Sequence, residues 1–253
     1  MKVSVITATT GNARLADCIK SVRNQTYKNI EHIVVVDGEE RWGTTNSILH
    51  GLGFPEGAER GPSSNEHVLV LPYATGKNRF NGHRIYGAFN FLANGDYVIW
   101  LDDDNELTSN HIQSLVNITK EKNLDWAYSL RQIVDDEGKF ICNDDCESLG
   151  KYKSVLNDHF VDVNCFFIRR ELAVNLAPIW YRQARPPQGM MEVDRALTTV
   201  LMHDKNNLKF DTNNDYTVKY RVGSTEISVK AEFFLQGNRT MLQRYNGELP
   251  WKK

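Results

Sequence analysis

The sequence predicts an α/β protein with a Rossmann-like, doubly wound mixed sheet and an elaborated C-terminal region. Over roughly the first 125 residues, stretches with strand character alternate with helical patterns, as in doubly wound sheets. The stretch at 3–9 is rich in strand-forming residues and ends in small polar residues. The stretch at 30–38 is almost continuously apolar toward its end, which is typical of a strand covered on both faces. Polar residues follow directly after several of these strands. A chain of 253 residues can fold as one large domain, so we expect a single domain over 1–253.

The expected elements follow one another along the chain. A strand at 3–9, a helix at 13–25 and a strand at 30–38 form a βαβ unit, because apolar residues in the middle segment recur at helical spacing. The later elements are expected as a loop at 39–66 with a short helix at 44–50, a strand at 67–72, a helix within 75–95 that Gly95 ends, a strand at 96–101, a helix at 109–123 capped by Thr108 or Ser109, strands at 125–135 and 161–171, and a helix at 190–204.

Composition and charge narrow the functional class. The net charge of −2 indicates no overall basic field for binding nucleic acid. No apolar run reaches the length of a transmembrane helix, and the N-terminus lacks a secretory pattern. A cytoplasmic protein is therefore expected, and peripheral association with a membrane is compatible with the same pattern. Cys142 and Cys146 are separated by three residues without a second pair, which is only a weak zinc signal.

Polar side chains follow three of the predicted strands where each strand ends. Thr7 and Thr9 end the first strand, Asp37 follows the second, and the cluster Asp102–Asp104 follows the strand at 96–101. In open α/β sheets, ligands bind outside the C-terminal ends of the strands. We therefore expect these groups at one edge of the sheet, where the Asp37 carboxylate suits hydrogen bonding to a ribose or a base.

The three consecutive aspartates predict a cation site. Neighbouring carboxylates repel one another, and a bound cation removes that penalty. Mg²⁺ and Mn²⁺ prefer oxygen ligands and commonly join one or two carboxylates to substrate phosphates. The alternative is that Asp102–Asp104 form a solvated turn or a helix cap. The polar groups at the other two strand ends favour the cation site.

The first block of motifs resembles the opening of family 2 glycosyltransferases of the GT-A fold. Such proteins typically have a strand that ends in a small polar turn, a helix that ends in S-x-x-x-Q-T-Y, and a second strand that ends in D-D-G-S. The sequence "VDG" at 36–38 lacks the second aspartate of that pattern. The positions that match are Ser21, Gln25, Thr26, Tyr27, Glu31 and Asp37.

A second block, at 81–105, resembles the segment of the same family that leads to its D-x-D element. The resemblance is specific in the order and spacing of its motifs over 1–110 and is weaker afterwards. It implies a nucleotide-binding half at about 1–110 and an acceptor-binding half at about 111–253. The positions that match in the second block are Arg84, Gly87, Asn90, Gly95 and Asp102–Asp104.

The resemblance implies a metal-dependent, inverting glycosyltransferase. The donor would be a nucleotide-diphosphate sugar, UDP-linked, and the acceptor would be a hydroxyl group, in the first place on a carbohydrate. Each matching site residue then has an implied role. Thr7, Ala8 and Thr9 would line the nucleotide pocket, Asp37 would bind the nucleobase, Arg84 would approach the nucleotide, Asp102 or Asp103 would reach the ribose, and Asp104 together with Asp102 would hold Mn²⁺ or Mg²⁺.

An inverting transfer also needs a carboxylate that removes a proton from the acceptor hydroxyl. The segment "QGMMEVDRAL" at 188–197 offers Glu192 and Asp194. The family usually shows E-D-x-x-L there, and Asp194 with Leu197 three residues later fits the aspartate of that pair. Val193 stands where glutamate is usual, so both carboxylates stay candidates, with Asp194 favoured. The alternative is an acidic helix start that only interacts with the helix dipole.

Several other side chains are weaker candidates, and each has an ordinary structural explanation as a core, surface or loop residue. His203 could be a late metal ligand, Lys77, Arg79 and His83 could touch phosphate, and Trp180 and Tyr181 could stack on an acceptor sugar.

Two other functional classes stay open. A sugar-phosphate nucleotidyltransferase would share the sheet and the cation, but such enzymes usually carry a glycine-rich loop with arginine and lysine after the first strand. The segment "TATTGNARLAD" at 7–17 has one glycine and no lysine. A non-catalytic nucleotide-sugar-binding module is favoured by Val193 and disfavoured by Asp194.

Overall fold

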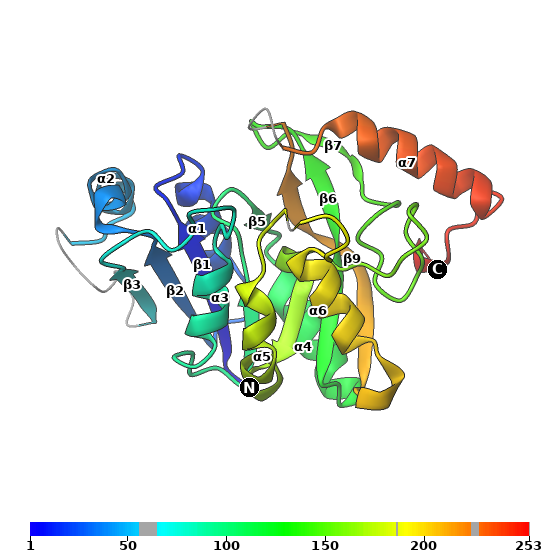
Figure 1. Cartoon of the computed structure of the whole chain (residues 1–253), viewed down its shortest axis with the longest axis horizontal. Coiled ribbons are helices and arrows are strands. Elements are labelled where there is room, and N and C mark those ends of the chain that lie inside the picture. Colours follow the sequence, from blue (N-terminus) through cyan, green and yellow to red (C-terminus); the bar gives the residue numbers. More distant parts are fainter. Residues whose placement is uncertain (56–64, 186, 224–227, 253) are drawn as a thin grey trace.

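The computed structural model describes residues 1–55, 65–185, 187–223 and 228–252. Its strands form one sheet in the order β3-β2-β1-β4-β8-β6-β9-β5, with β7 paired to β6. Figure 1 shows β1–β3 at one end of the sheet and β6 and β9 at the other. The strands are β1 (Val3–Thr9), β2 (Ile30–Val36), β3 (Glu66–Val70), β4 (Tyr97–Trp100), β5 (Glu106–Leu107), β6 (Trp126–Val134), β7 (Phe140–Asn143), β8 (Phe166–Arg169) and β9 (Phe210–Arg221).

Seven α-helices connect or cover these strands in the described part of the chain. The N-terminal helices follow the predicted βαβ pattern, and α7 lies at the outer end of the molecule, next to the C-terminus (Figure 1). The helices are α1 (Leu15–Arg23), α2 (Trp42–Gly51), α3 (His83–Phe89), α4 (His111–Lys122), α5 (Arg170–Asn175), α6 (Val193–Leu201) and α7 (Ala231–Arg244).

The predicted parallel arrangement of the N-terminal strands is confirmed. β1 pairs in parallel with both β2 and β4, and β2 pairs in parallel with β3. Thr9 lies opposite Val36, and Ile6 lies opposite Trp100, so the residues that follow these strands emerge at the same edge. Both faces of β1, β2 and β4 are buried, which explains the apolar runs in β4 and at the end of β2.

The C-terminal half makes the sheet mixed. β8 is antiparallel to both β4 and β6, whereas β6 and β9 run parallel over a long register. The sequence patterns did not indicate β9 or α7 as elements. Three of the four buried residues of β9 are polar, namely Thr212, Thr217 and Arg221. Helix α7 buries only Phe234, Gly237 and Met241. Neither apolar pattern is strong enough to stand out in the sequence.

Three predicted boundaries are wrong. α3 ends at Phe89, so Gly95 does not end it. Gly95 instead lies against β1, where an added Cβ would sit 2.5 Å from the Ser4 Oγ. α4 begins after Asn110 without a side-chain cap. The stretch predicted as a strand at 161–171 contains a 3-10 helix before β8.

The helices predicted at 44–50 and 190–204 are present as α2 and α6. Part of the predicted loop at 39–66, residues 56–64, lies outside the described residues.

Buried tryptophans dominate the core where the two halves of the sheet meet. Trp100 on β4 packs against Trp180 with ring centroids 4.7 Å apart, and Trp180 also packs against Tyr86 on α3 at 5.3 Å. Trp180 is therefore a core residue, and it is not exposed for stacking on a sugar. Among the described residues, no helix is both long enough and apolar enough to cross a membrane.

Candidate active site

A pocket of about 630 Å³ opens at the C-terminal ends of β1, β2 and β4. It is lined by groups from all three strand ends, together with the loop before α3 and Tyr86 on α3 itself. The predicted site residues that line it are Ala8, Thr9, Asp37, Asp102, Asp103 and Asp104, and Lys77 joins them. The pocket lies where an open α/β sheet is expected to bind its ligand.

The carboxylate of Asp102 is held on both sides. Tyr86 donates a hydrogen bond from its hydroxyl to Oδ1 at 2.6 Å, and Asn164 donates from Nδ2 to Oδ2 at 2.9 Å. The main-chain N–H of Asp102 donates to the Asn164 Oδ1 at 2.7 Å. Each carboxylate oxygen still has a free lone pair, so Asp102 can accept a further hydrogen bond from a ligand in the pocket.

Asp103 is tied to the turn after β1. The Thr9 hydroxyl donates to its Oδ2 at 2.5 Å, and the main-chain N–H groups of Thr10 and Asn12 also donate to its carboxylate. Burial nevertheless raises the pKa of Asp103 to about 6, and the charge of Asp102 adds to the effect. This contact joins the end of β1 to the aspartate cluster and shapes the floor of the pocket.

Asp104 is the least compensated member of the cluster. Burial raises its pKa to about 7, and the charges of Asp102 and Asp103 contribute to the same shift. Arg221 donates to the main-chain oxygen of Asp104 at 2.9 Å. In the part of the chain that the structure describes, no side chain donates a hydrogen bond to the Asp104 carboxylate.

The chemistry of this cluster fits a hard divalent cation. The pocket offers adjacent carboxylate oxygens whose mutual repulsion a cation would relieve. Across the described ranges, no group of three or more His, Cys, Asp or Glu side chains is arranged to hold a metal ion. A cation at Asp104 would therefore take its remaining ligands from a bound diphosphate and from water, as Mg²⁺ commonly does.

The raised pKa of Asp104 leads to a stability prediction for the cation-free protein. A carboxyl group with a raised pKa in the folded state stabilises that state when protonated, and this contribution is lost as the pH rises from about 4 to about 7. We expect Asp104→Asn to be more stable than the wild type at pH 8, by on the order of 1–2 kcal/mol after solvent screening. That corresponds to about 2–8 °C in Tm.

Thermal unfolding in a chelator at pH 4.5, 6 and 8 checks this expectation. The advantage of Asp104→Asn should grow between the lowest and the highest pH. Asp17→Asn is the matched control, because Asp17 is an exposed aspartate on α1. An advantage of Asp104→Asn that stays constant with pH would contradict the assigned pKa shift.

Asp37 organises the opposite wall of the pocket. Its Oδ1 accepts hydrogen bonds from the main-chain N–H and the hydroxyl of Thr75 at 2.6 and 2.8 Å, and its Oδ2 accepts from the N–H of Gly76 at 2.9 Å. Gly76 leaves room for this contact, because an added Cβ would lie 2.8 Å from the Asp37 Oδ2 and 2.5 Å from the Asn81 main-chain oxygen. Asp37 therefore lines the pocket and also positions the loop that closes it.

Two predicted nucleotide-binding residues do not line the pocket. Thr7 is buried inside β1, where its hydroxyl lies 3.0 Å from the His32 Nε2. Arg84 lies behind the loop, where it donates to the Thr75 main-chain oxygen at 3.3 Å. Its guanidinium carbon lies 3.8 Å from the Phe80 ring centroid and 5.0 Å from that of Tyr181. The Arg84 Nε is buried and has no hydrogen-bond partner among the described residues.

The two candidate bases are at the start of α6, outside the lining of the pocket. Glu192 is exposed and lies 3.5 Å from the Arg195 Nε. Asp194 is half-buried, and burial raises its pKa to about 7, with added repulsion from Asp162 and Glu192. The Asp162 charge also acts on Asp102, which places all three carboxylates in one electrostatic neighbourhood.

The weaker candidates have ordinary surroundings. His203 is exposed, and its Nδ1 accepts a hydrogen bond from the Lys205 N–H. The His83 Nδ1 lies 2.9 Å from the Arg182 main-chain oxygen, and Tyr181 is largely exposed. The Arg79 main-chain oxygen accepts from Ala184, which joins the loop before α3 to the segment before α6. Both cysteines of the weak zinc signal, Cys142 and Cys146, are free.

The sequence analysis missed Tyr86 and Asn164, which hold the Asp102 carboxylate. Tyr86 lies on the apolar side of α3, where nothing in the sequence distinguishes it from a core residue. Asn164 and Asp162 are polar residues within the apolar run "FVDVNCFFI" at 160–168. Buried polar residues of this kind need hydrogen-bond partners, so their position within an apolar run could have indicated that Asp162 and Asn164 contact other polar groups.

Residues 63–176 match the family model described as Glycosyl transferase family 2. The predicted resemblance is confirmed over this segment. It contains Arg84 and Asp102–Asp104, whereas Asp37 and Asp194 lie outside it. None of the curated proteins compared with the chain matches it.

Solved structures share the fold at low sequence identity. Residues 1–349 of TarS from S. aureus in complex with UDP superpose with a TM-score of 0.62 and 14% identity, over 98% of this chain and 72% of that one. The complex of TarS 1–349 with UDP-GlcNAc superposes with a TM-score of 0.61 and 14% identity, over 96% of this chain and 66% of that one. The longer TarS structure superposes with a TM-score of 0.57 and 15% identity, over 96% of this chain and 39% of the TarS chain.

These matches confirm the predicted GT-A glycosyltransferase fold. The family match and the shared fold together support the prediction of a glycosyltransferase enzyme.

Proposed function

We propose that this glycosyltransferase moves a sugar from a UDP-linked donor to an acceptor hydroxyl, with inversion and with a divalent cation. The observation that carries the proposal is the pocket at the strand ends, which gathers Asp37 and the three consecutive aspartates. TarS, which has the same fold, has been solved with UDP and with UDP-GlcNAc. UDP-GlcNAc is therefore the first donor to test.

The proposed transfer uses Asp194 as the general base. Its carboxylate takes the proton of the acceptor hydroxyl while the hydroxyl oxygen forms a bond to the anomeric carbon. The bond between that carbon and the diphosphate oxygen breaks, and its electron pair leaves with the diphosphate. A base whose pKa is about 7 is suited to this work, because it is ionised in a useful fraction and still binds a proton well.

In this proposal Asp104, with Asp102, holds Mg²⁺ or Mn²⁺ against the diphosphate. A cation bound there neutralises the charge that develops on the leaving group. Asp102 would also accept a hydrogen bond from the ribose of UDP, since Tyr86 and Asn164 fix its carboxylate beside the pocket. Asp37 and the loop that it holds would enclose the nucleobase.

A donor panel tests the proposal. Purified protein with Mg²⁺ or Mn²⁺ is incubated with UDP-GlcNAc, UDP-glucose, UDP-galactose and GDP-mannose, and release of the nucleoside diphosphate is measured. We expect slow hydrolysis of one UDP-sugar, with water as the acceptor. Asp17→Ala is the matched control for variants of the pocket aspartates.

Two results would contradict the proposal. The first is a lack of both UDP binding and UDP release under all cation conditions. The second is release of pyrophosphate from UTP and a sugar 1-phosphate, which would indicate a nucleotidyltransferase.

A further inference from the structure

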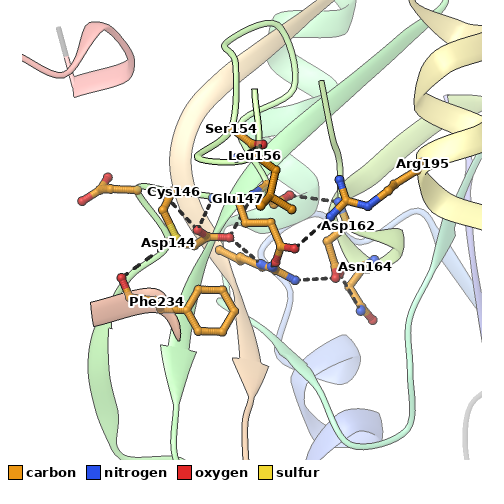
Figure 2. Close-up of polar contacts among 12 residues, drawn as sticks. Asp144, Cys146, Glu147, Ser154, Leu156, Asp162, Asn164, Arg195 and Phe234 are labelled. Carbon is orange, nitrogen blue, oxygen red and sulfur yellow. Dashed lines mark hydrogen bonds and ion pairs between the residues drawn. The ribbon is translucent and has the colours of Figure 1, made fainter. Parts of the chain in front are cut away.

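A buried cluster of charged side chains lies between the pocket and α6. Arg131 on β6 is 1% exposed, and its guanidinium forms ion pairs with Asp144 at 2.8 Å, with Glu147 at 2.6 Å and with Asp162. Figure 2 shows the side chains of Asp144, Glu147 and Asp162 gathered in one cluster. Together with Arg195 and Asn164, we call these residues the Arg131 network.

The surroundings of Arg131 restrict its movement. Its guanidinium carbon lies 4.1 Å from the Tyr220 ring centroid and 5.3 Å from that of Phe234, so aromatic rings border the group that the carboxylates bind. Buried ion pairs of this kind contribute little net stability compared with apolar packing. Their geometry is nevertheless well defined, because a guanidinium binds carboxylates through a rigid set of donors. The network is therefore suited to fixing positions.

One end of the network reaches the pocket. Asp162 accepts hydrogen bonds at Oδ1 from the main-chain N–H and the Nδ2 of Asn164, at 3.0 and 2.8 Å. The same Nδ2 donates to Asp102, whose main-chain N–H donates back to the Asn164 Oδ1. Asn164 thus contacts Asp102 through both ends of its amide, and Arg131 holds the aspartate that orients this amide.

The other end reaches the helix that carries the candidate base. Glu147 lies 3.1 Å from the Arg195 Nη2, and Arg195 follows Asp194 directly on α6. The Arg195 main-chain N–H donates to the Asp194 Oδ1 at 2.9 Å. The first turn of α6 and the carboxylate of Asp102 are therefore connected to the same buried arginine.

We propose that Asn164 and Asp162 are positioning residues of the donor pocket, held in place by Arg131. Asn164 sets the orientation of the Asp102 carboxylate that receives the donor nucleotide, and Asp162 sets the orientation of Asn164. This inference rests on the proposed function, because it assigns Asp102 to contact with UDP.

Asn164→Ala and Asn164→Asp test the proposal together. Alanine removes the amide, whereas aspartate keeps its volume but presents oxygens to Asp102 and Asp162 where Asn164 presents an N–H donor. UDP affinity is measured by calorimetry with Mg²⁺, well below the Tm of each protein. We expect both variants to bind UDP about 10–100-fold more weakly than the wild type, because a misoriented Asp102 carboxylate would lose its hydrogen bond to the bound nucleotide, and this is the range for losing a hydrogen bond to a charged group.

Asn90→Ala is the matched control. Asn90 is also a buried asparagine whose amide makes two hydrogen bonds, to the Ala173 main-chain oxygen and from the Trp100 indole. We expect it to lower the Tm as Asn164→Ala does while keeping UDP affinity within about twofold, since it has no contact with Asp102.

The possible outcomes distinguish a failure of the positioning role from a failure of the proposed function. If the wild type binds UDP and Asn164→Asp binds it equally well, Asn164 only fills space and the positioning role is overturned. If Asn90→Ala weakens UDP binding as much as Asn164→Ala does, the loss is general destabilisation and the role is again overturned. A wild type that does not bind UDP would overturn the proposed function and this inference with it.

Discussion

Replacing Asp194 with asparagine should lower kcat for release of the sugar from its donor by about 10²–10⁴-fold, the usual contribution of a general base. The amide keeps the shape of the side chain but cannot take the proton of the acceptor. UDP affinity should stay within about twofold, because Asp194 does not line the nucleotide pocket. Steady-state rates and UDP calorimetry on the same preparations measure the two quantities separately.

The pH dependence of the reaction rate is a second test of Asp194 as the base. Burial holds the pKa of Asp194 at about 7, so the base is protonated and inactive below that pH. The wild-type rate should therefore fall about tenfold for each pH unit below about 6 and level off above about 8. At saturating Mg²⁺, which would keep Asp104 ionised, this acid limb should be absent from the residual activity of Asp194→Asn.

Glu192→Gln is the matched control for the base. Glu192 is exposed and pairs with Arg195, so the rate should change by less than about threefold. If Glu192→Gln lost activity while Asp194→Asn kept it, the roles of these two carboxylates would be exchanged. That result would leave the donor pocket unaffected.

Removing the divalent cation, or replacing Asp104 with alanine, should abolish measurable turnover and weaken UDP binding by at least about tenfold. In the proposed site the diphosphate and the carboxylates repel one another unless a cation lies between them. Calorimetry of UDP with Mg²⁺, with Mn²⁺ and with EDTA measures the dependence directly. The readout does not depend on knowing the acceptor.

A control variant distinguishes loss of the bound cation from a general disturbance of the fold. Asp104→Ala should bind UDP with equal affinity in Mg²⁺ and in EDTA, whereas Asp17→Ala should keep the full cation dependence. Wild-type binding of UDP that is the same in Mg²⁺ and in EDTA would remove the cation from the proposal. The three aspartates would then act only through hydrogen bonds to the nucleotide.

The N-terminal half of the fold could be predicted because its signals are local. Strands buried on both faces tend to contain apolar runs, and β2 and β4 lie where such runs placed them. The strand-forming residues of β1 placed that strand. β9 was missed for the opposite reason. Most of its buried residues are polar, and its pairing partner β6 begins more than 80 residues earlier in the chain. Nothing local to the segment reveals that pairing.

The meeting of Asp37 with Asp102–Asp104 in one pocket was also predictable, because parallel strands bring their C-terminal ends to the same edge. Tyr86 and Asn164 were not predictable in the same way. Their role comes from side-chain contacts across the fold: Asn164 reaches Asp102 from a segment 62 residues away. Sequence patterns describe one element at a time and do not contain such contacts.

By itself the sequence was sufficient for the fold class, for the edge of the sheet at which the pocket opens, and for the motifs that the family model matches. Those properties follow from hydrophobic periodicity and from strand direction, which neighbouring residues encode. The tertiary structure decided that Thr7 and Arg84 lie away from the pocket, that Asp102 is held by Tyr86 and Asn164, and that one buried arginine links the pocket to α6. Burial and hydrogen bonds between distant segments set these features, and they exist only once the chain has folded.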